Sequence, residues 1–302
     1  MSRRKRGLNI HGIILLDKPV GLSSNRALQK VRGMFQARKA GHTGSLDPFA
    51  TGMLPVCLGE ASKTAAFMLE AGKRYRATAK LGEATTTGDV EGQVIKECPL
   101  PGVDSISLAR ALKKFVGRIE QVPPMYSALK YQGKPLYEYA RAGIEIDRPA
   151  RTVNIHGLDL IEWKSPYLTF DVYCSKGTYI RTLAEDIATA MDSCAHLVVL
   201  RRIHVEPFED YPMHTLEQLQ EALDQGELQS FLLPVDVGLT DWPRVDVDSV
   251  QVGKFKHGNQ FLFSVDPQVV GKVRVYSSSD ELLGLADLSD DGVLQPSRVF
   301  NV

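Results

Sequence analysis

The chain has 302 residues, of which 43% are hydrophobic and 24% charged, the composition of a soluble globular protein rather than a disordered or collagen-like one. At roughly 100–200 residues per domain, this length predicts about two domains, or one large domain with an appendage. No apolar run approaches the ~20 residues that a membrane span needs, and no signal-peptide apolar segment follows the basic N-terminus. We therefore predict a cytoplasmic protein with no membrane partner.

The formal net charge of zero conceals an asymmetry between the two ends of the chain. Residues 1–80 contain 15 basic and 4 acidic side chains, a net charge of +11, whereas residues 205–302 contain 6 and 17, a net charge of −11. A basic excess of this size is typical of a surface that binds the phosphates of a nucleic acid. The alternative is that the basic residues cover solvated helix faces.

Hydrophobic periodicity predicts both strands and helices in the first two-thirds of the chain. Ser23 and Ser24 can cap the first helix, whose apolar residues follow at helical spacing. Residues 74–80 alternate between polar and apolar, as a half-buried strand does. The predicted strands are 12–17, 54–58, 74–80, 152–163, 168–174 and 196–203, and the predicted helices are 24–36, 107–116, 178–191 and 216–223.

The composition changes near Leu233 and Pro234, and short strands separated by glycines follow from about Pro243. This pattern predicts a small β-barrel of about sixty residues. No internal repeat or low-complexity stretch is present. The chain is therefore expected to be a mixed α+β protein with a β appendage.

Several kinds of site lack their sequence signatures. No Gly-x-x-x-x-Gly-Lys-Ser/Thr loop is present to hold nucleotide phosphates, and no Gly-x-Gly-x-x-Gly segment to hold a dinucleotide. Cys57, Cys98, Cys174 and Cys194 have irregular spacing and are not expected to form a disulfide framework in a chain of this size. Cys174, Cys194 and His196 lack the paired spacing of zinc ligands. We predict no metal site.

A glycine-rich segment over residues 41–55 stands out because an aspartate, Asp47, precedes a proline within it. Gly41, Gly44 and Gly52 allow the backbone conformations that a shaped loop needs. Asp, Gly, Ser and Pro are also the usual residues of ordinary turns. Composition alone therefore leaves two alternatives open, a turn or a catalytic loop.

This segment, Gly41-His42-Thr43-Gly44-Ser45-Leu46-Asp47-Pro48 continuing through Ala50-Thr51-Gly52-Met53-Leu54-Pro55, closely resembles the catalytic motif of the TruB family of tRNA pseudouridine synthases. Further matching blocks occur in chain order between about residues 12 and 204. They are Leu16-Asp17-Lys18-Pro19, Lys73-Arg74-Tyr75, Met125-Tyr126-Ser127-Ala128-Leu129-Lys130, Ser175-Lys176-Gly177-Thr178-Tyr179-Ile180-Arg181 and Leu200-Arg201-Arg202.

The resemblance implies isomerisation of uridine to pseudouridine in the T loop of tRNA, at the position customarily numbered 55, without a cofactor. It implies a pseudouridine synthase catalytic domain over residues 1–240, built on a mixed, mainly antiparallel sheet with helices and a central catalytic cleft. A PUA-like RNA-binding β-barrel over residues 243–302 would follow. The acidic tail departs from a basic RNA-binding domain, although Lys254, Lys256 and His257 could form a local patch.

The resemblance also implies roles for individual residues. Asp47 matches the essential carboxylate, which could attack C1′ or C6 of the nucleotide or act as a base toward the ribose. Arg181 matches its ion-pair partner, and Tyr75 matches a tyrosine that stacks on the target base and is a candidate base in one route. The substrate-binding matches are His42, which occupies the space vacated by the everted nucleotide, Tyr179 and Leu200, which line the pocket, and Lys18 and Lys63, which lie near the site.

Two other functions fit the same blocks. One is a non-catalytic RNA-binding protein or tRNA-folding chaperone, and the other is the RNA-guided branch of the superfamily, which works with partner proteins. The joint presence of Asp47, Tyr75 and Arg181 favours a catalytic protein, and no long basic C-terminal extension is present. We expect a stand-alone monomer whose partner is the T arm of tRNA, from which the stacked uridine must be everted.

Overall fold

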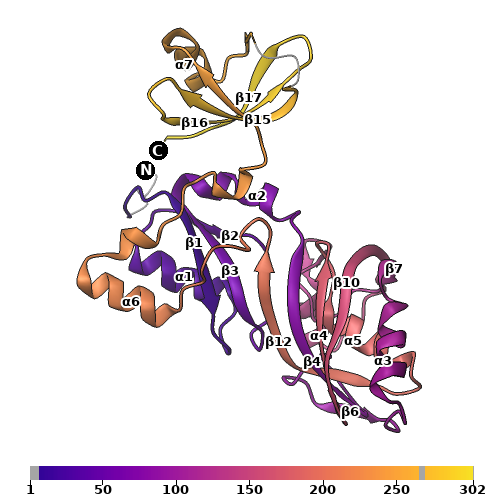
Figure 1. Ribbon diagram of the computed structural model, residues 1–302. Coiled ribbons are helices and arrows are strands. Elements are labelled where there is room, and N and C mark those ends of the chain that lie inside the picture. Colours follow the sequence, from indigo (N-terminus) through magenta and orange to yellow (C-terminus); the bar gives the residue numbers. More distant parts are fainter. Residues whose placement is uncertain (1–6, 265–268, 302) are drawn as a thin grey trace.

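The computed structural model describes residues 7–264 and 269–301 and has an α+β fold (Figure 1). The strands of its main sheet are β1 (Gly12–Lys18), β2 (Ala40–His42), β3 (Thr51–Leu58), β4 (Lys73–Leu81), β7 (Gly117–Gln121), β10 (Arg151–Lys164), β11 (Tyr167–Cys174) and β12 (Ala195–Val205). Their order is β1-β3-β12-β4-β11-β10-β7, with β2 paired to β3. Neighbouring strands are antiparallel except β12 and β3. The predicted mixed, mainly antiparallel sheet is confirmed.

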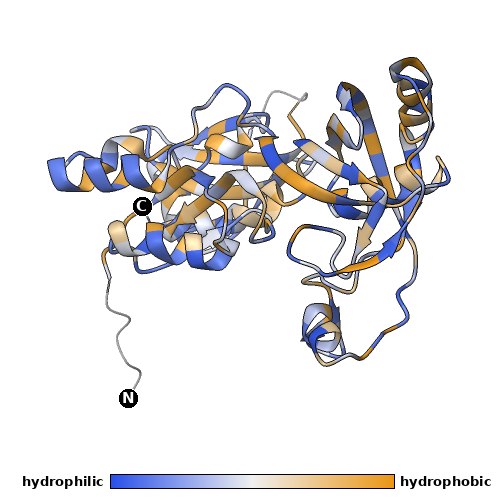
Figure 2. Ribbon diagram, turned by 90° about the horizontal axis from the view of Figure 1, so that it is seen from below, coloured by the Kyte–Doolittle hydropathy of each residue, from blue (hydrophilic) through white to orange (hydrophobic). Residues whose placement is uncertain are grey.

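Helices cover this sheet in two groups, which create two hydrophobic cores. α1 (Ser24–Met34) and α6 (Leu216–Gln225) pack on β1 and β3, whereas α3 (Ser105–Lys113) and α5 (Ile180–Thr189) pack against β4, β10, β11 and β12. In Figure 2 the peripheral helices carry hydrophobic and hydrophilic bands, the pattern of amphipathic helices that cover a core. None of the helices in the described ranges has the length and apolarity needed to span a bilayer. β12 lies between β3 and β4 and so joins the two halves.

Short elements connect the main ones and shape the surroundings of the sheet. They are η1 (Gly59–Lys63), α2 (Ala65–Met68), β5 (Glu83–Thr85), β6 (Val94–Glu97), β8 (Lys130–Tyr131), β9 (Lys134–Pro135), α4 (Leu136–Arg141), η2 (Leu228–Phe231) and η3 (Val237–Leu239). β5 and β6 form an antiparallel hairpin that follows β4 directly.

Several helix boundaries differ from the predicted ones by two or three residues, and two of these differences have a clear local reason. α1 ends at Met34 instead of residue 36 because Gln36 adopts a left-handed φ of 49°. α5 begins at Ile180 instead of residue 178 because Gly177 has a φ of 77° and Tyr179 stays extended as the N-cap. The turn between β11 and α5 therefore ends at Tyr179, and Arg181 lies in the first turn of the helix.

The C-terminal region forms a separate curled sheet (Figure 1), which confirms the predicted small β fold and fits the PUA-like class. Its strands are β13 (Arg244–Val247), β14 (Phe261–Leu262), β15 (Gly271–Ser277), β16 (Leu282–Leu288) and β17 (Val293–Val299), in the order β13-β15-β16-β17-β14. Leu285 and Phe300 of this region belong to the same buried cluster as Ile13 and Leu15 of β1, so an apolar contact joins the two parts.

The helix α7 (Ser249–Lys256), which lies in this region, was not predicted from the sequence. Asp248 caps it, because its carboxylate accepts hydrogen bonds from the backbone N–H groups of Val250 and Gln251, both at 2.8 Å. Phe255 is the one fully buried residue of the helix, so the segment has no apolar stripe at helical spacing. The capping signal was present in the sequence but the periodic signal was not.

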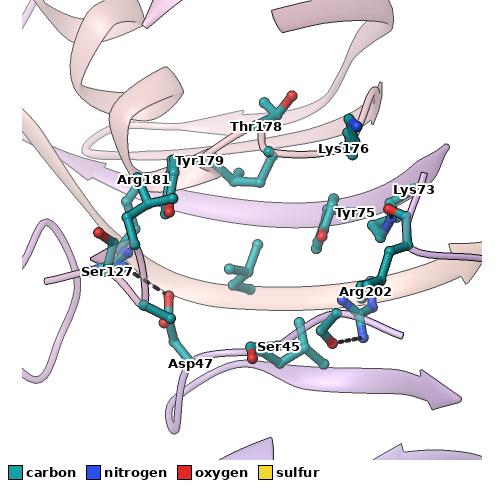
Figure 3. A pocket seen from close by; sticks show the side chains of 18 residues that line it. Ser45, Asp47, Lys73, Tyr75, Ser127, Lys176, Thr178, Tyr179, Arg181 and Arg202 are labelled. Carbon is teal, nitrogen blue, oxygen red and sulfur yellow. Dashed lines mark hydrogen bonds and ion pairs between the residues drawn. The ribbon is translucent and has the colours of Figure 1, made fainter. Parts of the chain in front are cut away.

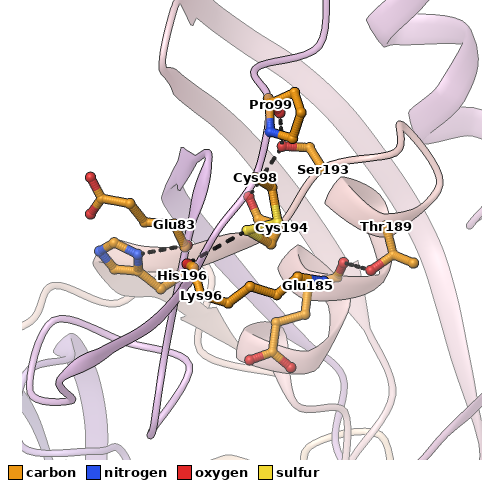
Figure 4. Close-up of a disulfide and its surroundings, with 9 residues drawn as sticks. All are labelled: Glu83, Lys96, Cys98, Pro99, Glu185, Thr189, Ser193, Cys194 and His196. Atoms are coloured by element: carbon orange, nitrogen blue, oxygen red, sulfur yellow. Dashed lines mark hydrogen bonds between the residues drawn. A yellow bond between two sulfur atoms is a disulfide. The ribbon is translucent and has the colours of Figure 1, made fainter.

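The cysteines correct the expectation drawn from their spacing. A disulfide joins Cys98, just after β6, to Cys194, just before β12, with Cα atoms 5.8 Å apart (Figure 4). The two residues are 96 positions apart, so only the fold shows that they are neighbours. Cys174 lies beside one end of β4 and Cys194 beside the other end. Cys174, Cys194 and His196 are therefore too far apart to bind one zinc ion together. Within residues 7–264 and 269–301, no three or more His, Cys, Asp or Glu side chains are grouped so that they could hold a metal ion.

Candidate active site

A pocket of about 350 Å³ opens where β12 joins the two halves of the sheet (Figure 3). It is lined by the loop before β3, by β4 and β12, by residues 127–129, and by the turn at 176–181 that leads into α5. Its two ends differ in chemistry. Asp47 and Arg181 lie at one end and Lys73 and Arg202 at the other, with Tyr75 between them (Figure 3).

The loop that carries Asp47 is fixed by a close backbone approach and by a buried hydroxyl. Gly52 has a φ of 100°, and a Cβ added there would lie 2.2 Å from the carbonyl oxygen of Arg202, so only glycine fits. The Ser24 hydroxyl, at the start of α1, bonds both the N–H of Leu46 at 2.7 Å and its carbonyl at 2.9 Å. These contacts hold the residue that precedes Asp47.

Lys18 lies beneath the same loop and is fully buried. Its ammonium donates to the carbonyl oxygens of Pro19 at 2.9 Å, Leu22 at 2.6 Å and Pro48 at 3.3 Å. An ammonium has three N–H donors, and these three carbonyls match that number. Burial lowers the pKa of Lys18 to about 8, an effect that the negative charge of Asp47 opposes. Lys18 thus supports the geometry of the Asp47 loop from below and does not line the pocket.

The structure brings Asp47 and Arg181 together as an ion pair, with Arg181 Nη2 at 3.1 Å from Asp47 Oδ2. The Arg181 side chain is only 5% exposed. Its guanidinium also pairs with Asp89 at 3.3 Å and donates to the carbonyl oxygens of Thr87 at 2.7 Å and Tyr126 at 2.8 Å. Because three groups besides Asp47 hold the guanidinium, its position is set before any substrate arrives.

The carboxyl group of Asp47 is enclosed by protein except toward the pocket, where the side chain keeps 39% of its surface exposed. This burial raises the pKa of Asp47, and the nearby charge of Asp89 raises it further. Arg181 is the main group that lowers this pKa, and Lys18 acts in the same direction. A ligand that fills the pocket removes more water, so an ionised Asp47 depends on Arg181.

Tyr75, Tyr179 and Leu200 all line the pocket. Tyr75 points into it from β4 (Figure 3), and its side chain is nearly buried. Burial raises the pKa of the Tyr75 hydroxyl, while the positive charge of Arg202 lowers it. Burial likewise raises the pKa of Tyr179. The hydroxyls therefore stay protonated at neutral pH, and the rings offer a flat surface to a base.

His42 and Lys63 do not line the pocket. His42 lies in β2, and burial, followed by the charge of Arg202, lowers its pKa. Its Nδ1 is buried without a hydrogen-bond partner among the described residues, so a ligand beside it could supply that hydrogen bond. Lys63 pairs with Glu60 and donates to the carbonyl of Val299 at 2.7 Å. The structure therefore places Lys63 at the contact with the C-terminal sheet, away from Asp47.

Sequence reasoning missed Asp89, Lys73 and Arg202 as members of this site. Arg202 and Lys73 fall inside two of the matching blocks, and that position was the available signal. Asp89 belongs to none of these blocks. It reaches Arg181 because the β5–β6 hairpin folds back on β12 through a bridge between Asp89 and Leu197.

Part of the basic excess is exposed on the surface of the N-terminal part of the chain. Exposed basic residues on α1 and just after it are Arg26, Lys30, Arg38 and Lys39. The basic residues at positions 3–6 lie outside the described residues. In the C-terminal sheet Lys254 is exposed, but Lys256 pairs with Glu281 at 2.9 Å, which weakens the patch expected around His257. The cationic surface therefore belongs mainly to the first half of the chain.

The fold and the site together define a pseudouridine synthase. A crystal structure of a Cbf5–Nop10–Gar1 complex matches with a TM-score of 0.72 and 26% identity, covering 96% of this chain and 85% of that chain. A structure of an H/ACA RNP bound to a substrate RNA containing 2′-deoxyuridine shares the fold, with a TM-score of 0.72 and 22% identity. The latter covers 100% of this chain and 92% of that one.

Sequence comparison identifies the family. The family model of the TruB family pseudouridylate synthase N-terminal domain matches residues 32–180. The model of the tRNA pseudouridylate synthase B C-terminal domain matches residues 181–240. The model of the C-terminal region of pseudouridine synthase II TruB matches residues 243–300. tRNA pseudouridine synthase B of Actinobacillus pleuropneumoniae serotype 5b is 48% identical, and that of Mannheimia succiniciproducens 49%, each over 100% of both chains. The chain belongs to the TruB family of pseudouridine synthases.

Proposed function

We propose that this protein isomerises uridine to pseudouridine in tRNA, at position 55 of the T loop. The observation that carries the proposal is the Asp47–Arg181 ion pair at one end of a pocket with aromatic walls. The named relatives, tRNA pseudouridine synthases B, support tRNA as the substrate. A base stacked within a T loop cannot reach Asp47, so the uridine must be everted into the pocket.

In this reaction the bond between C1′ and N1 breaks, the uracil turns, and its C5 joins C1′ of the same ribose. The reaction is an isomerisation, so it consumes no electron carrier or group donor. We assign the essential carboxylate to Asp47 and the group that keeps it ionised to Arg181. Whether Asp47 attacks C1′, attacks C6 or acts as a base toward the ribose, it must be ionised first.

We assign Tyr75 as the surface on which the everted uracil stacks and as a candidate proton-transfer group. Tyr179 and Leu200 would complete the walls around the base, which their place in the lining supports. His42, with its unpartnered Nδ1, would contact the RNA beside the pocket. Lys18 would act through the loop that it supports, and Lys63 through the contact with the C-terminal sheet.

The exposed cations on and after α1 would contact the phosphates of the tRNA arm, and the acidic C-terminal sheet, our proposed PUA-like domain over residues 243–302, would contribute less. We propose residues 1–240 as the catalytic domain. We further propose that the protein is cytoplasmic, works as a monomer and needs no protein partner or cofactor. The Cbf5 relative is seen with Nop10 and Gar1, and a stand-alone protein would differ from it in this respect.

The proposal is tested by incubating the purified protein with an unmodified tRNA transcript and mapping pseudouridine by a chemical method that reports position. Pseudouridine at position 55 alone is the expected result, with the same yield in excess EDTA once the tRNA is folded. A transcript with cytidine at that position is the matched control and should stay unmodified. Tight tRNA binding without any product would instead favour the RNA-binding or chaperone alternative.

A further inference from the structure

Two buried cations line the end of the pocket opposite Asp47 (Figure 3). Lys73 is 7% exposed and Arg202 is 1% exposed. Lys73 donates to two backbone carbonyls at 2.7 and 3.2 Å, and Arg202 donates to two others at 2.6 and 3.1 Å. Within residues 7–264 and 269–301, neither forms an ion pair with a carboxylate.

Such an arrangement is unfavourable unless something else supplies negative charge. A buried cation without a counter-ion loses hydration that backbone carbonyls replace only in part. Burial and the charge of Arg202 lower the pKa of Lys73, to about 8, so the two cations also repel each other. Both retain N–H donors beyond those used, since an ammonium has three and a guanidinium five. An oxygen atom of the substrate that bears negative charge would satisfy them.

The register of the sheet places the two cations on the same face as Tyr75. Arg202 lies directly opposite Tyr75 in the pairing of β12 with β4, and Lys73 precedes Tyr75 by two residues, so all three side chains share one face. If the ribose of a uridine stacked on Tyr75 lies toward Asp47, the uracil edge with O4 and N3 points toward the two cations at the other end of the pocket. Lys176, which also lines the pocket, differs from them because its side chain is 56% exposed and already forms an ion pair with Glu70.

We propose that Lys73 and Arg202 bind the carbonyl oxygens of the target uracil and stabilise the negative charge that the ring carries during the isomerisation. This inference rests on the proposed function. If the C1′–N1 bond breaks first, its electron pair stays with the ring and spreads over N1, O2 and O4. If Asp47 adds to C6, the electron pair of the C5–C6 double bond moves toward O4. The charge disappears once C5 has bonded to C1′, C5 has lost its proton and N1 has gained one; in the second route the bond between Asp47 and C6 must also break, which returns the free carboxylate.

The test is a cycle that combines a protein variant with substituted substrates. Lys73→Met removes the ammonium and keeps an apolar stem of similar length. Single-turnover rates are measured on full-length tRNA that carries uridine, 2-thiouridine or 4-thiouridine at the target position, because sulfur accepts hydrogen bonds weakly. On uridine we expect Lys73→Met to lose about 10²–10³ in rate, the range for a donor to a developing oxyanion. On one of the thio substrates the loss should shrink at least about tenfold, since the two changes remove the same contact.

The matched control is Arg76→Met, because Arg76 lies on the opposite face of β4 with a half-exposed side chain paired to Asp171. It should leave the rates on all three RNAs near those of the wild type. Circular dichroism checks that each variant folds. If Lys73→Met does not fold, Arg202→Lys replaces it in the same cycle, since it keeps a cation and loses the planar fork.

Equal losses of Lys73→Met on all three RNAs would show a structural role only and would overturn the inference. Coupling to a methylphosphonate at a neighbouring phosphate, without coupling to either thio substrate, would assign the cations to the RNA backbone and would also overturn it. A wild-type protein that makes no pseudouridine in tRNA would refute the proposed function itself. The two failures are therefore distinguishable.

Discussion

Replacing Arg181 by methionine removes the counter-ion of two carboxylates at once. Asp89 and Asp47 lie 3.3 and 3.1 Å from the guanidinium, but their surroundings differ. The Asp89 side chain is 3% exposed, whereas that of Asp47 is 39% exposed toward the pocket. Without Arg181, water can still solvate Asp47, but Asp89 is left as a buried charge without its counter-ion.

The expected cost follows from that difference. Removing one partner of a buried ion pair costs about 3–5 kcal/mol, because the remaining charge is uncompensated, while an exposed pair is worth at most about 1 kcal/mol. We therefore expect Arg181→Met to lower the free energy of unfolding by about 3–5 kcal/mol. Asp89→Asn added to it removes the stranded charge and keeps the oxygen that accepts from Thr87 at 2.6 Å and from the N–H of Glu91 at 3.0 Å. The double variant should have a free energy of unfolding about 2 kcal/mol higher than that of Arg181→Met alone.

Urea unfolding at neutral pH, followed by circular dichroism, measures all four proteins of this cycle. The wild type, the two single variants and the double variant give the coupling energy directly. An Arg181→Met protein within about 1 kcal/mol of the wild type would refute the reasoning. So would a double variant destabilised by the full sum of the two single effects.

Three further predictions concern the same structure. Burial raises the pKa of Asp47 above 3.8 and the carboxylate must be ionised, so the acid limb of the kcat/KM profile should lie at higher pH than for an ordinary aspartate. In Arg181→Met this limb should move to still higher pH, and a limb at the same pH as in the wild type would contradict the role of Arg181. If the Tyr75 hydroxyl moves a proton, Tyr75→Phe should lose about 10²–10⁴ in single-turnover rate, and Tyr75→Leu a further 5- to 150-fold or so by losing the stacked ring; a fully active Tyr75→Phe would leave stacking as its whole role. Cys194→Ser should lower the free energy of unfolding of the oxidised protein by up to about 4–5 kcal/mol and leave the reduced protein's stability nearly unchanged; equal melting of oxidised wild type and variant would exclude a contribution from the disulfide.

The fold class was predictable because its signals are local. Alternation along β4 and helical spacing in α1 and α5 reflect the side of each element that faces a core. α7 was missed because a helix with a single fully buried residue leaves no periodic pattern. The disulfide was missed because it depends on the meeting of segments 96 residues apart, which no spacing rule describes.

Only part of the site was predictable from the sequence, and that part came from the resemblance to the TruB family. It named Asp47 and Arg181, which the structure places in contact. Asp89 could not be found because its contact with Arg181 arises from the way the β5–β6 hairpin folds on β12. Lys18 and Lys63 look alike in sequence, yet Lys18 supports the loop that carries Asp47 and Lys63 contacts the C-terminal sheet. A lysine's role depends on what surrounds it in space.

The single-turnover rate of Asp47→Asn on the same tRNA tests most directly whether this pocket carries out the isomerisation. The substitution keeps the size of the side chain and removes the charge that faces Arg181. Because affinity for RNA comes mainly from phosphate contacts, tRNA binding should stay within about tenfold of the wild type while pseudouridine formation disappears. A well-folded Asp47→Asn protein that still forms pseudouridine at more than a trace of the wild-type rate would contradict the assignment of Asp47 as the essential group.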